Sequence, residues 1–173
     1  MNKKLYTSFT LCLALLIPAC LSAQDYSKVD LGFGMGMDYG GLGMRVTGYP
    51  SKAIAVFGGL GYAFAGVGFN GGVNANFKQK GRVRGYATAM YGYNGALVVT
   101  GDIQMKKFYY GPSFGLGLKL ESRRNDMNFW NFELLLPVRD PAFEDTVKDL
   151  QNNGVSMSPV LPIAWSIGYH FGF

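Results

Sequence analysis

Large apolar residues alternate with small or polar residues along most of this chain, and the alternation is strictest at its C-terminal end. Trp165, Ile167, Tyr169, Phe171 and Phe173 are bulky, whereas the residues between them are Ser, Gly, His and Gly. Successive side chains of a β-strand point to opposite faces. The pattern therefore predicts a closing strand with one aromatic, lipid-facing side and one small, polar side.

The same period of two recurs in seven earlier segments, each near the ~10 residues that a tilted transmembrane strand requires. No stretch after the N-terminal region approaches the ~20 continuous apolar residues of a membrane helix. We therefore expect an all-β fold, an eight-stranded antiparallel up-and-down transmembrane β-barrel. The predicted strands are Val29–Asp38, Gly41–Tyr49, Ala53–Phe64, Gly66–Lys78, Arg82–Asn94, Phe108–Leu120, Met127–Pro137 and Pro162–Phe173.

The even number of strands predicts which connections lie on which side of the membrane. Both chain ends return to one side, which in an outer-membrane barrel is the periplasm. Short hydrophilic turns are predicted there, at 50–52, 79–81 and 121–126. Longer connections are predicted outside, at 95–107 and 138–161. Two further outer loops, near Tyr39–Gly40 and Ala65–Gly66, are predicted to be minimal.

The last long connection carries a helix signal. Asp140 suits an N-cap and Pro141 the first helical position, and Phe143, Val147 and Leu150 follow with helical spacing. We expect a short extracellular helix from Pro141 to Leu150. One interpretation is a lid over the barrel mouth, or a contact for a partner or for lipid headgroups. The other is a long loop that covers its own apolar side chains.

The inward faces of the predicted strands combine glycines with a few charged residues. An eight-stranded barrel is just wide enough to be filled by side chains, so porin-like diffusion is not expected. Charges inside it must be paired or hydrated. Glu133 alternates with bulky apolar residues, which predicts that it faces inward and pairs with a base, foremost Arg45. The predicted polar network of the lumen contains Asp30, Arg45, Arg84, Lys119, Glu133 and His170.

Two roles suit this polar network. The first is a structural plug of ion pairs, and the second is the binding of a ligand or a proton. The many inward glycines are equally open to two interpretations. They leave a cavity, or they make room for large inward side chains such as Phe57 and Tyr86.

Residues 1–23 have the parts of a secretory signal peptide. Lys3 and Lys4 form a basic start, Leu11 to Ile17 a short apolar run, and Ala23 precedes an ordinary cleavage site. The alternative is lipoprotein processing, in which Cys20 is lipidated after cleavage. The sequence thus predicts export from the cytoplasm.

Composition agrees with a single exported domain, residues 24–173. The chain is 49% hydrophobic and contains 25 glycines, which suits a barrel with lipid outside and polar groups inside. Both cysteines lie in the leader, so neither a disulfide nor a cysteine metal site is expected in the remainder. The formal charge of +5 falls when the leader is removed. Nucleic acid is therefore not an expected partner.

Motifs for catalysis or cofactor binding fail on context. Residues 66–71 spell G-x-G-x-x-G, but they open a predicted strand and precede no helix that could hold a pyrophosphate. His170 is the only histidine, and a lone inward histidine is more often a hydrogen-bonded filler than a base or a metal ligand. Ser113 has no visible partner. We predict no enzyme activity, no cofactor, no metal and no catalytic residue.

Several segments resemble a known class of protein. They are Ala89–Asn94, Tyr109–Gly115, Asn128–Pro137 and the closing strand with its final Phe173. They look like the small porin-like outer-membrane β-barrel proteins of Gram-negative bacteria, most of which have no assigned function. The resemblance implies a location in the cell outer membrane, contact with its lipid, and recognition of the C-terminal strand by the barrel-assembly machinery. It carries over no functional residue.

Three classes of function follow from the sequence. The leading one is a structural or interaction barrel with an unidentified protein partner. The second is a narrow transport barrel or one that binds a lipid or solute, for which an open lumen is the discriminating feature. The third is a lipid-modifying enzyme, which needs an activated nucleophile or base near the outer leaflet.

Overall fold

The computed structural model of this chain describes residues 28–63, 66–77, 81–99, 105–125, 127–139, 141–152 and 162–173. The predicted signal peptide, both cysteines and the predicted N-cap Asp140 lie outside the described residues. Within those ranges no helix has the length and apolar character needed to cross a membrane.

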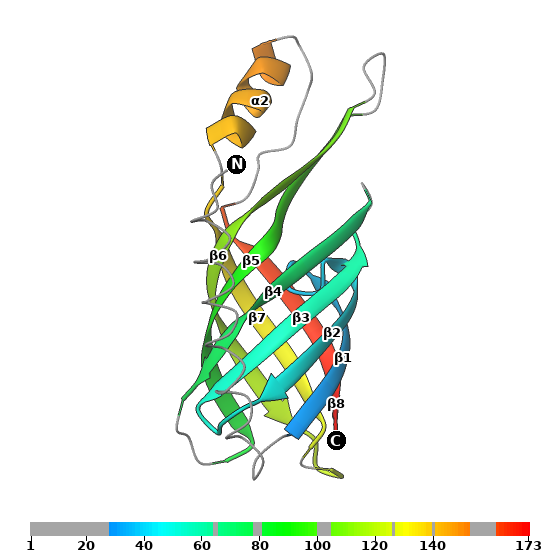
Figure 1. Cartoon of the computed structure of the whole chain (residues 1–173), viewed down its shortest axis with the longest axis vertical. Helices are drawn as coiled ribbons and strands as arrows, with labels where there is room; N and C mark the ends of the chain where they lie inside the picture. Colours follow the sequence, from blue (N-terminus) through cyan, green and yellow to red (C-terminus); the bar gives the residue numbers. More distant parts are fainter. Residues whose placement is uncertain are drawn as a thin grey trace, which may run out of the picture.

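Eight antiparallel strands close into a barrel in sequence order, which confirms the predicted up-and-down all-β fold (Figure 1). The last strand pairs with the first, from Asp30 opposite Gly172 to Gly36 opposite Ser166. The strands are β1 (Lys28–Gly36), β2 (Gly41–Tyr49), β3 (Ile54–Tyr62), β4 (Val67–Asn76), β5 (Val83–Val99), β6 (Met105–Glu121), β7 (Phe129–Pro137) and β8 (Ala164–Gly172). Six of these differ from the predicted segments by at most two residues at either end.

The hairpin of β5 and β6 is much longer than predicted. Each strand has 17 residues, and their pairing continues to Val99 opposite Met105. The register shifts between Tyr93 and Gly95. Such a bulge adds a residue to one strand and breaks the alternation of its side chains. The sequence pattern was lost there, so the prediction of a loop over 95–107 was wrong for most of that segment.

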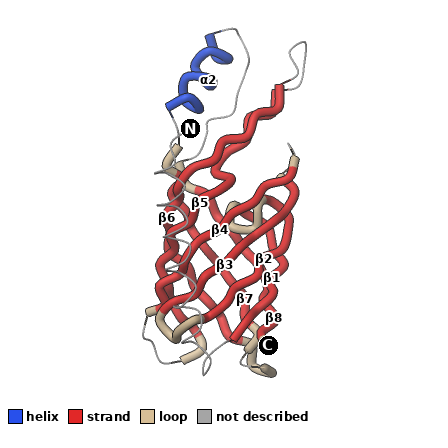
Figure 2. The backbone as a smooth tube through the Cα atoms, viewed as in Figure 1, coloured by secondary structure: helices blue, strands red, loops and turns tan. Residues whose placement is uncertain are grey.

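We call the end of the barrel where β1 begins and β8 ends the terminal end, and the opposite end the distal end. The β5–β6 ribbon continues beyond the distal end, as does the helix α2 (Pro141–Asn152) between β7 and β8 (Figures 1 and 2). The helix occupies the segment for which the sequence predicts one and runs two residues further. We refer to the ribbon and α2 together as the projection.

Helix α2 contacts the ribbon near its first turns, where Phe143 packs on Tyr109. Phe143 and Leu150 are buried and Val147 is partly buried. The ring of Phe143 meets Tyr109 of β6 edge-on at 4.8 Å between centroids, and the Tyr109 hydroxyl donates to Thr146 Oγ1 at 2.9 Å. These contacts fit the interpretation in which the segment covers its own apolar side chains.

The turn between β1 and β2 is short, as predicted, but it is not an outer loop. Residues 37–40 are all buried. A Cβ added at Gly59 or Gly61 of β3, or at Gly68 of β4, would collide with the backbone of this turn. Figure 2 shows the turn as a tan segment within the outline of the barrel. We call residues 37–40 the inward turn; β1 correspondingly ends at Gly36 rather than at the predicted Asp38.

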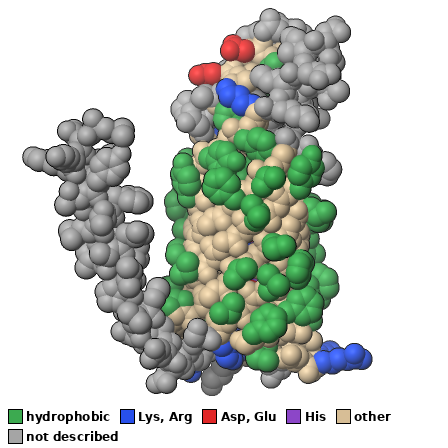
Figure 3. All heavy atoms as spheres, turned by 45° about the vertical axis from the view of Figure 1, so that its right-hand side comes forward, with side chains coloured by type: hydrophobic (Ala, Val, Ile, Leu, Met, Phe, Trp, Pro, Cys, Tyr) green, Lys and Arg blue, Asp and Glu red, His purple; other side chains and the backbone are tan. Residues whose placement is uncertain are grey.

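The outer wall of the barrel is apolar. Large hydrophobic side chains on all eight strands are exposed. On the face that Figure 3 shows, they are spread over the whole height of the wall, and the charged side chains lie at its two ends. On β8, Trp165, Phe171 and Phe173 are exposed and Ile167 and Tyr169 are partly exposed. The alternate residues Ser166, Gly168 and His170 are buried on the inner face. The predicted inside–outside register of the closing strand is thus the one observed.

Candidate functional site: the polar lumen

Arg45 of β2 is the centre of the buried charges. Its Nη1 lies 3.2 Å from Glu133 Oε2 on β7, so the predicted pair is present. The same nitrogen lies 2.5 Å from Asp38 Oδ2 on the inward turn, and the guanidinium stacks over Phe57 at 3.7 Å. All three charged side chains are almost fully buried. Arg45 therefore ties the inward turn to the far wall of the barrel.

Glu133 is also held by a tyrosine. The Tyr86 hydroxyl lies 2.9 Å from Glu133 Oε2 and also contacts the side-chain oxygen of Asn131, so its single hydrogen is shared between two acceptors. Its ring lies against Gly117, where any added Cβ would overlap it. The glycine next to this ring thus makes room for a large inward side chain and does not leave a cavity.

A second group of contacts fixes the other side of the inward turn. His170 Nδ1 lies 2.6 Å from Asp30 Oδ1, and His170 Nε2 lies 2.6 Å from the Tyr39 hydroxyl. Phe129 stacks on the imidazole at 4.6 Å. Gly168 leaves the space that the Tyr39 ring occupies, since an added Cβ would collide with its hydroxyl. Tyr39 is fully buried, so its hydroxyl is not an accessible nucleophile. The contacts from Asp30 to His170 and from His170 to Tyr39 instead hold the inward turn in place.

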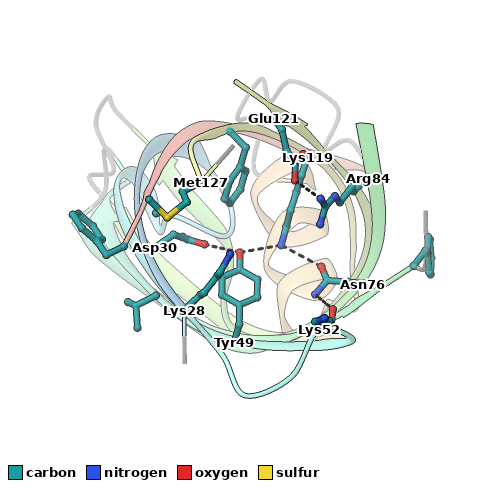
Figure 4. Close-up of a pocket in the computed structure, with 14 residues that line it drawn as sticks. Lys28, Asp30, Tyr49, Lys52, Asn76, Arg84, Lys119, Glu121 and Met127 are labelled. Carbon is teal, nitrogen blue, oxygen red and sulfur yellow. Dashed lines mark hydrogen bonds and ion pairs between the residues drawn. The ribbon is translucent and has the colours of Figure 1, made fainter. Parts of the chain in front are cut away.

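Lys119 belongs to the terminal half of the lumen. Its ammonium donates to the Tyr49 hydroxyl at 3.1 Å and to Asn76 Oδ1 at 3.2 Å, and Tyr49 in turn donates to Asp30 Oδ2 at 2.5 Å. The rings of Tyr49, Tyr86 and Phe129 lie 4.7 to 5.3 Å from the ammonium. Lys119 and Asp30 are thus linked through one tyrosine, as Figure 4 shows.

Arg84 does not join the lumen network, and that part of the prediction was wrong. Its side chain is 53% exposed at the terminal end and pairs with Glu121 at 2.8 Å. The alternation correctly placed Arg84 on the same face as Tyr86. However, Arg84 is the last inward residue at its end of the strand, so its side chain reaches the opening of the barrel and is exposed to solvent. Asp38 and Tyr39 were missed for the opposite reason, because strand alternation says nothing about the direction of a turn.

A cavity of about 280 Å³ opens at the terminal end, beside Lys119. Figure 4 shows its lining side chains arranged around the opening. They include cationic, acidic and apolar groups. The lining residues are Lys28, Val29, Asp30, Tyr49, Lys52, Asn76, Phe77, Arg84, Lys119, Glu121, Met127, Phe129, Gly172 and Phe173.

Other chemistry-bearing residues have structural surroundings. Ser113 is buried, and its hydroxyl donates to the sulfur of Met37 at 3.5 Å. Residues 67–71, most of the G-x-G-x-x-G match, lie within β4. In the part of the chain that the structure describes, no group of three or more His, Cys, Asp or Glu side chains is placed to hold a metal ion.

Comparison with known proteins adds no assignment: no protein-family model, no curated protein and no solved structure matches this chain.

Proposed function

We propose that this chain is a plugged barrel of the Gram-negative outer membrane, with a structural or interaction role. It holds the projection at the cell surface, where a protein partner binds it. The observation that carries the proposal is the inward turn. Its Asp38 is paired with Arg45 and its Tyr39 is bonded to His170, so the lumen is occupied at the level where a conducting pore needs to be open.

The membrane location is supported by the wall and by the strand lengths. Six strands have nine or ten residues, close to the ~9–11 that span a bilayer when tilted. An exposed apolar belt is what lipid requires and what water disfavours. The closing strand ends in the aromatic pattern that the barrel-assembly machinery is expected to recognise. These features also support the small porin-like class that the sequence resembles.

The interaction role is supported by the projection. Strands β5 and β6 have 17 residues each and α2 has 12, so both extend further than closure of an eight-stranded barrel requires. Asp145 and Asp149 are exposed on α2. Packing of Phe143 on Tyr109 and the hydrogen bond from Tyr109 to Thr146 restrain the N-terminal part of α2, which lowers the entropy cost of binding a partner.

Site-specific photocrosslinking tests this role. A photoreactive residue at Asp145 or Asp149 is expected to give a discrete adduct on intact cells. The matched controls are Lys52 and Arg123, which are exposed beyond the opposite end of the strands. Discrete adducts from the control positions alone, or from none, would contradict the proposal.

The orientation has its own test. An introduced cysteine at Asp145 should react with a membrane-impermeant maleimide on intact cells, whereas one at Lys52 should react only after permeabilisation. No native cysteine of residues 24–173 interferes, because the chain has only Cys12 and Cys20. The reverse labelling would show that the barrel is inserted the other way round.

A further inference from the structure

The cavity at the terminal end has the composition of a site for an anion with an apolar part. Four of its lining side chains are cationic, namely Lys28, Lys52, Arg84 and Lys119, and two are carboxylates, Asp30 and Glu121. Its apolar lining is made by Val29, Phe77, Met127, Phe129 and Phe173. Positive charge and apolar surface therefore face the same small volume.

Lys119 is the most buried of the four cationic side chains that line the cavity. It is only 8% exposed, and in the described ranges no carboxylate lies within ion-pair distance of it. An ammonium has three donors. Two of them reach the neutral oxygens of Tyr49 and Asn76. Figure 4 shows the nitrogen pointing toward the middle of the opening. A buried cation without a paired carboxylate is costly unless another anion approaches it.

The two carboxylates of the lining are already bound. Asp30 contacts His170 and accepts from Tyr49, and Glu121 pairs with Arg84. Arg84 itself stays half-exposed at the edge of the cavity. The lining therefore offers an incoming anion the buried ammonium of Lys119 and, at its edge, the half-exposed Arg84 guanidinium, which shares its five N–H donors with Glu121.

We propose that the terminal cavity binds an amphiphilic anion, a carboxylate or phosphate oxyanion that carries a short apolar chain. The oxyanion contacts Lys119 and Arg84, and the chain lies against Phe129 and Met127. The volume of about 280 Å³ is just below the ~300–1,000 Å³ of typical small-molecule sites, so one short chain is the most that fits. This site goes beyond the proposed interaction role and lies at the other end of the barrel.

Calorimetry on the folded protein in phosphatidylcholine nanodiscs tests the site. The probes are hexyl phosphate, inorganic phosphate and hexyltrimethylammonium. Hexyl phosphate is expected to bind most tightly, inorganic phosphate more weakly because it lacks the chain, and the cation not at all. Equal binding of both phosphates would overturn the apolar part of the proposal and identify free phosphate as the ligand. Equal binding of the cation would overturn the site as a whole.

Two variants locate the binding. Lys119→Met should weaken hexyl phosphate at least about tenfold, as expected for loss of a charge-assisted hydrogen bond. Lys107→Met is the matched control, because Lys107 is an exposed lysine near the other end of the same strand. If Lys119→Met does not fold, Arg84→Gln at the exposed edge should still weaken binding several-fold. Unchanged affinity in a folded Lys119→Met protein would overturn the proposal.

A membrane source of the oxyanion is distinguished by lipid composition. If the ligand is a lipid headgroup, nanodiscs that contain phosphatidic acid should reduce the apparent affinity for hexyl phosphate, and Lys119→Met should remove that competition. If it is a soluble amphiphile, the nanodisc composition should leave the affinity unchanged. Both results support the site. Photocrosslinking from α2 does not depend on either result, so failure of this site and failure of the interaction role are distinguishable.

Discussion

Arg45 contacts two carboxylates inside the barrel, and this determines what its removal should do. Arg45→Met leaves Asp38 and Glu133 buried without their cation, which typically costs about 3–5 kcal/mol of unfolding free energy. Glu133→Gln should cost less, since Arg45 keeps Asp38. Urea unfolding in lipid vesicles, followed by tryptophan fluorescence, measures both.

The neutral triple variant Asp38→Asn, Arg45→Met, Glu133→Gln is the control for this pair of predictions. It buries no charge at this position, so it should recover part of the stability that Arg45→Met loses. If the triple variant instead loses the sum of the unfolding free energies lost by the three single variants, the three charges do not stabilise one another.

Gly117 offers a test of packing in the lumen. Gly117→Ala places a Cβ on the ring of Tyr86 and should lower the unfolding free energy by about 1–3 kcal/mol through overpacking. Gly58→Ala is the matched control, because an added Cβ there meets nothing within 4 Å. With Tyr86→Leu in the background, the penalty of Gly117→Ala should shrink. An equal penalty in both backgrounds would assign the effect to the backbone instead.

Residues were predictable from the sequence where strand alternation alone decides their position. Glu133 lies between bulky apolar neighbours on its strand, and Arg45 alternates with apolar residues on its own strand, so both side chains were expected to face inward. Because the lumen of an eight-stranded barrel is narrow, two inward charges of opposite sign were expected to meet. Asp38 and Tyr39 depend on the turn folding back into the barrel. That is a tertiary property, accommodated by glycines on β3, β4 and β8. The clue available in the sequence is an acidic and an aromatic residue directly before Gly40-Gly41.

At the level of elements, the positions of all eight strands were predictable, but the lengths of β5 and β6 were not. Period-two alternation located all eight strands, because a barrel with an apolar outer wall and a filled polar lumen needs unlike residues on its two faces. The bulge between Tyr93 and Gly95 interrupts this period. The ribbon beyond it does not enclose the lumen, so its two faces need not differ as those of the barrel wall do. Helix α2 was predictable because Pro141 at its start and the spacing of its apolar residues are local signals.

The contact between α2 and the ribbon should be separable from the barrel. Phe143→Ala removes the ring that packs on Tyr109 and approaches Gly95. We expect limited proteolysis to cut within α2 several-fold faster, because loss of this buried side chain releases the helix locally. Barrel folding should be unchanged in the same sample, as judged by its mobility on an unheated gel. Val138→Ala, an exposed position before α2, is the control.

For the whole molecule, a closed sheet without free edges predicts high resistance to detergent. The purified protein should migrate differently on a detergent gel before and after boiling. It should also be recovered with the outer-membrane fraction, since its exposed wall is apolar. Recovery entirely in the soluble periplasmic fraction would contradict a membrane-spanning barrel.

The measurement that most directly tests for a plugged lumen is conductance of the folded protein in a planar lipid bilayer. We expect insertion without a steady ionic current, because the inward turn occupies the lumen and is held by Arg45 and His170. Replacing Asp38 and Tyr39 with alanine removes both attachments and should produce open events. A steady ohmic current through the unaltered protein, unchanged by these replacements, would contradict a plugged barrel.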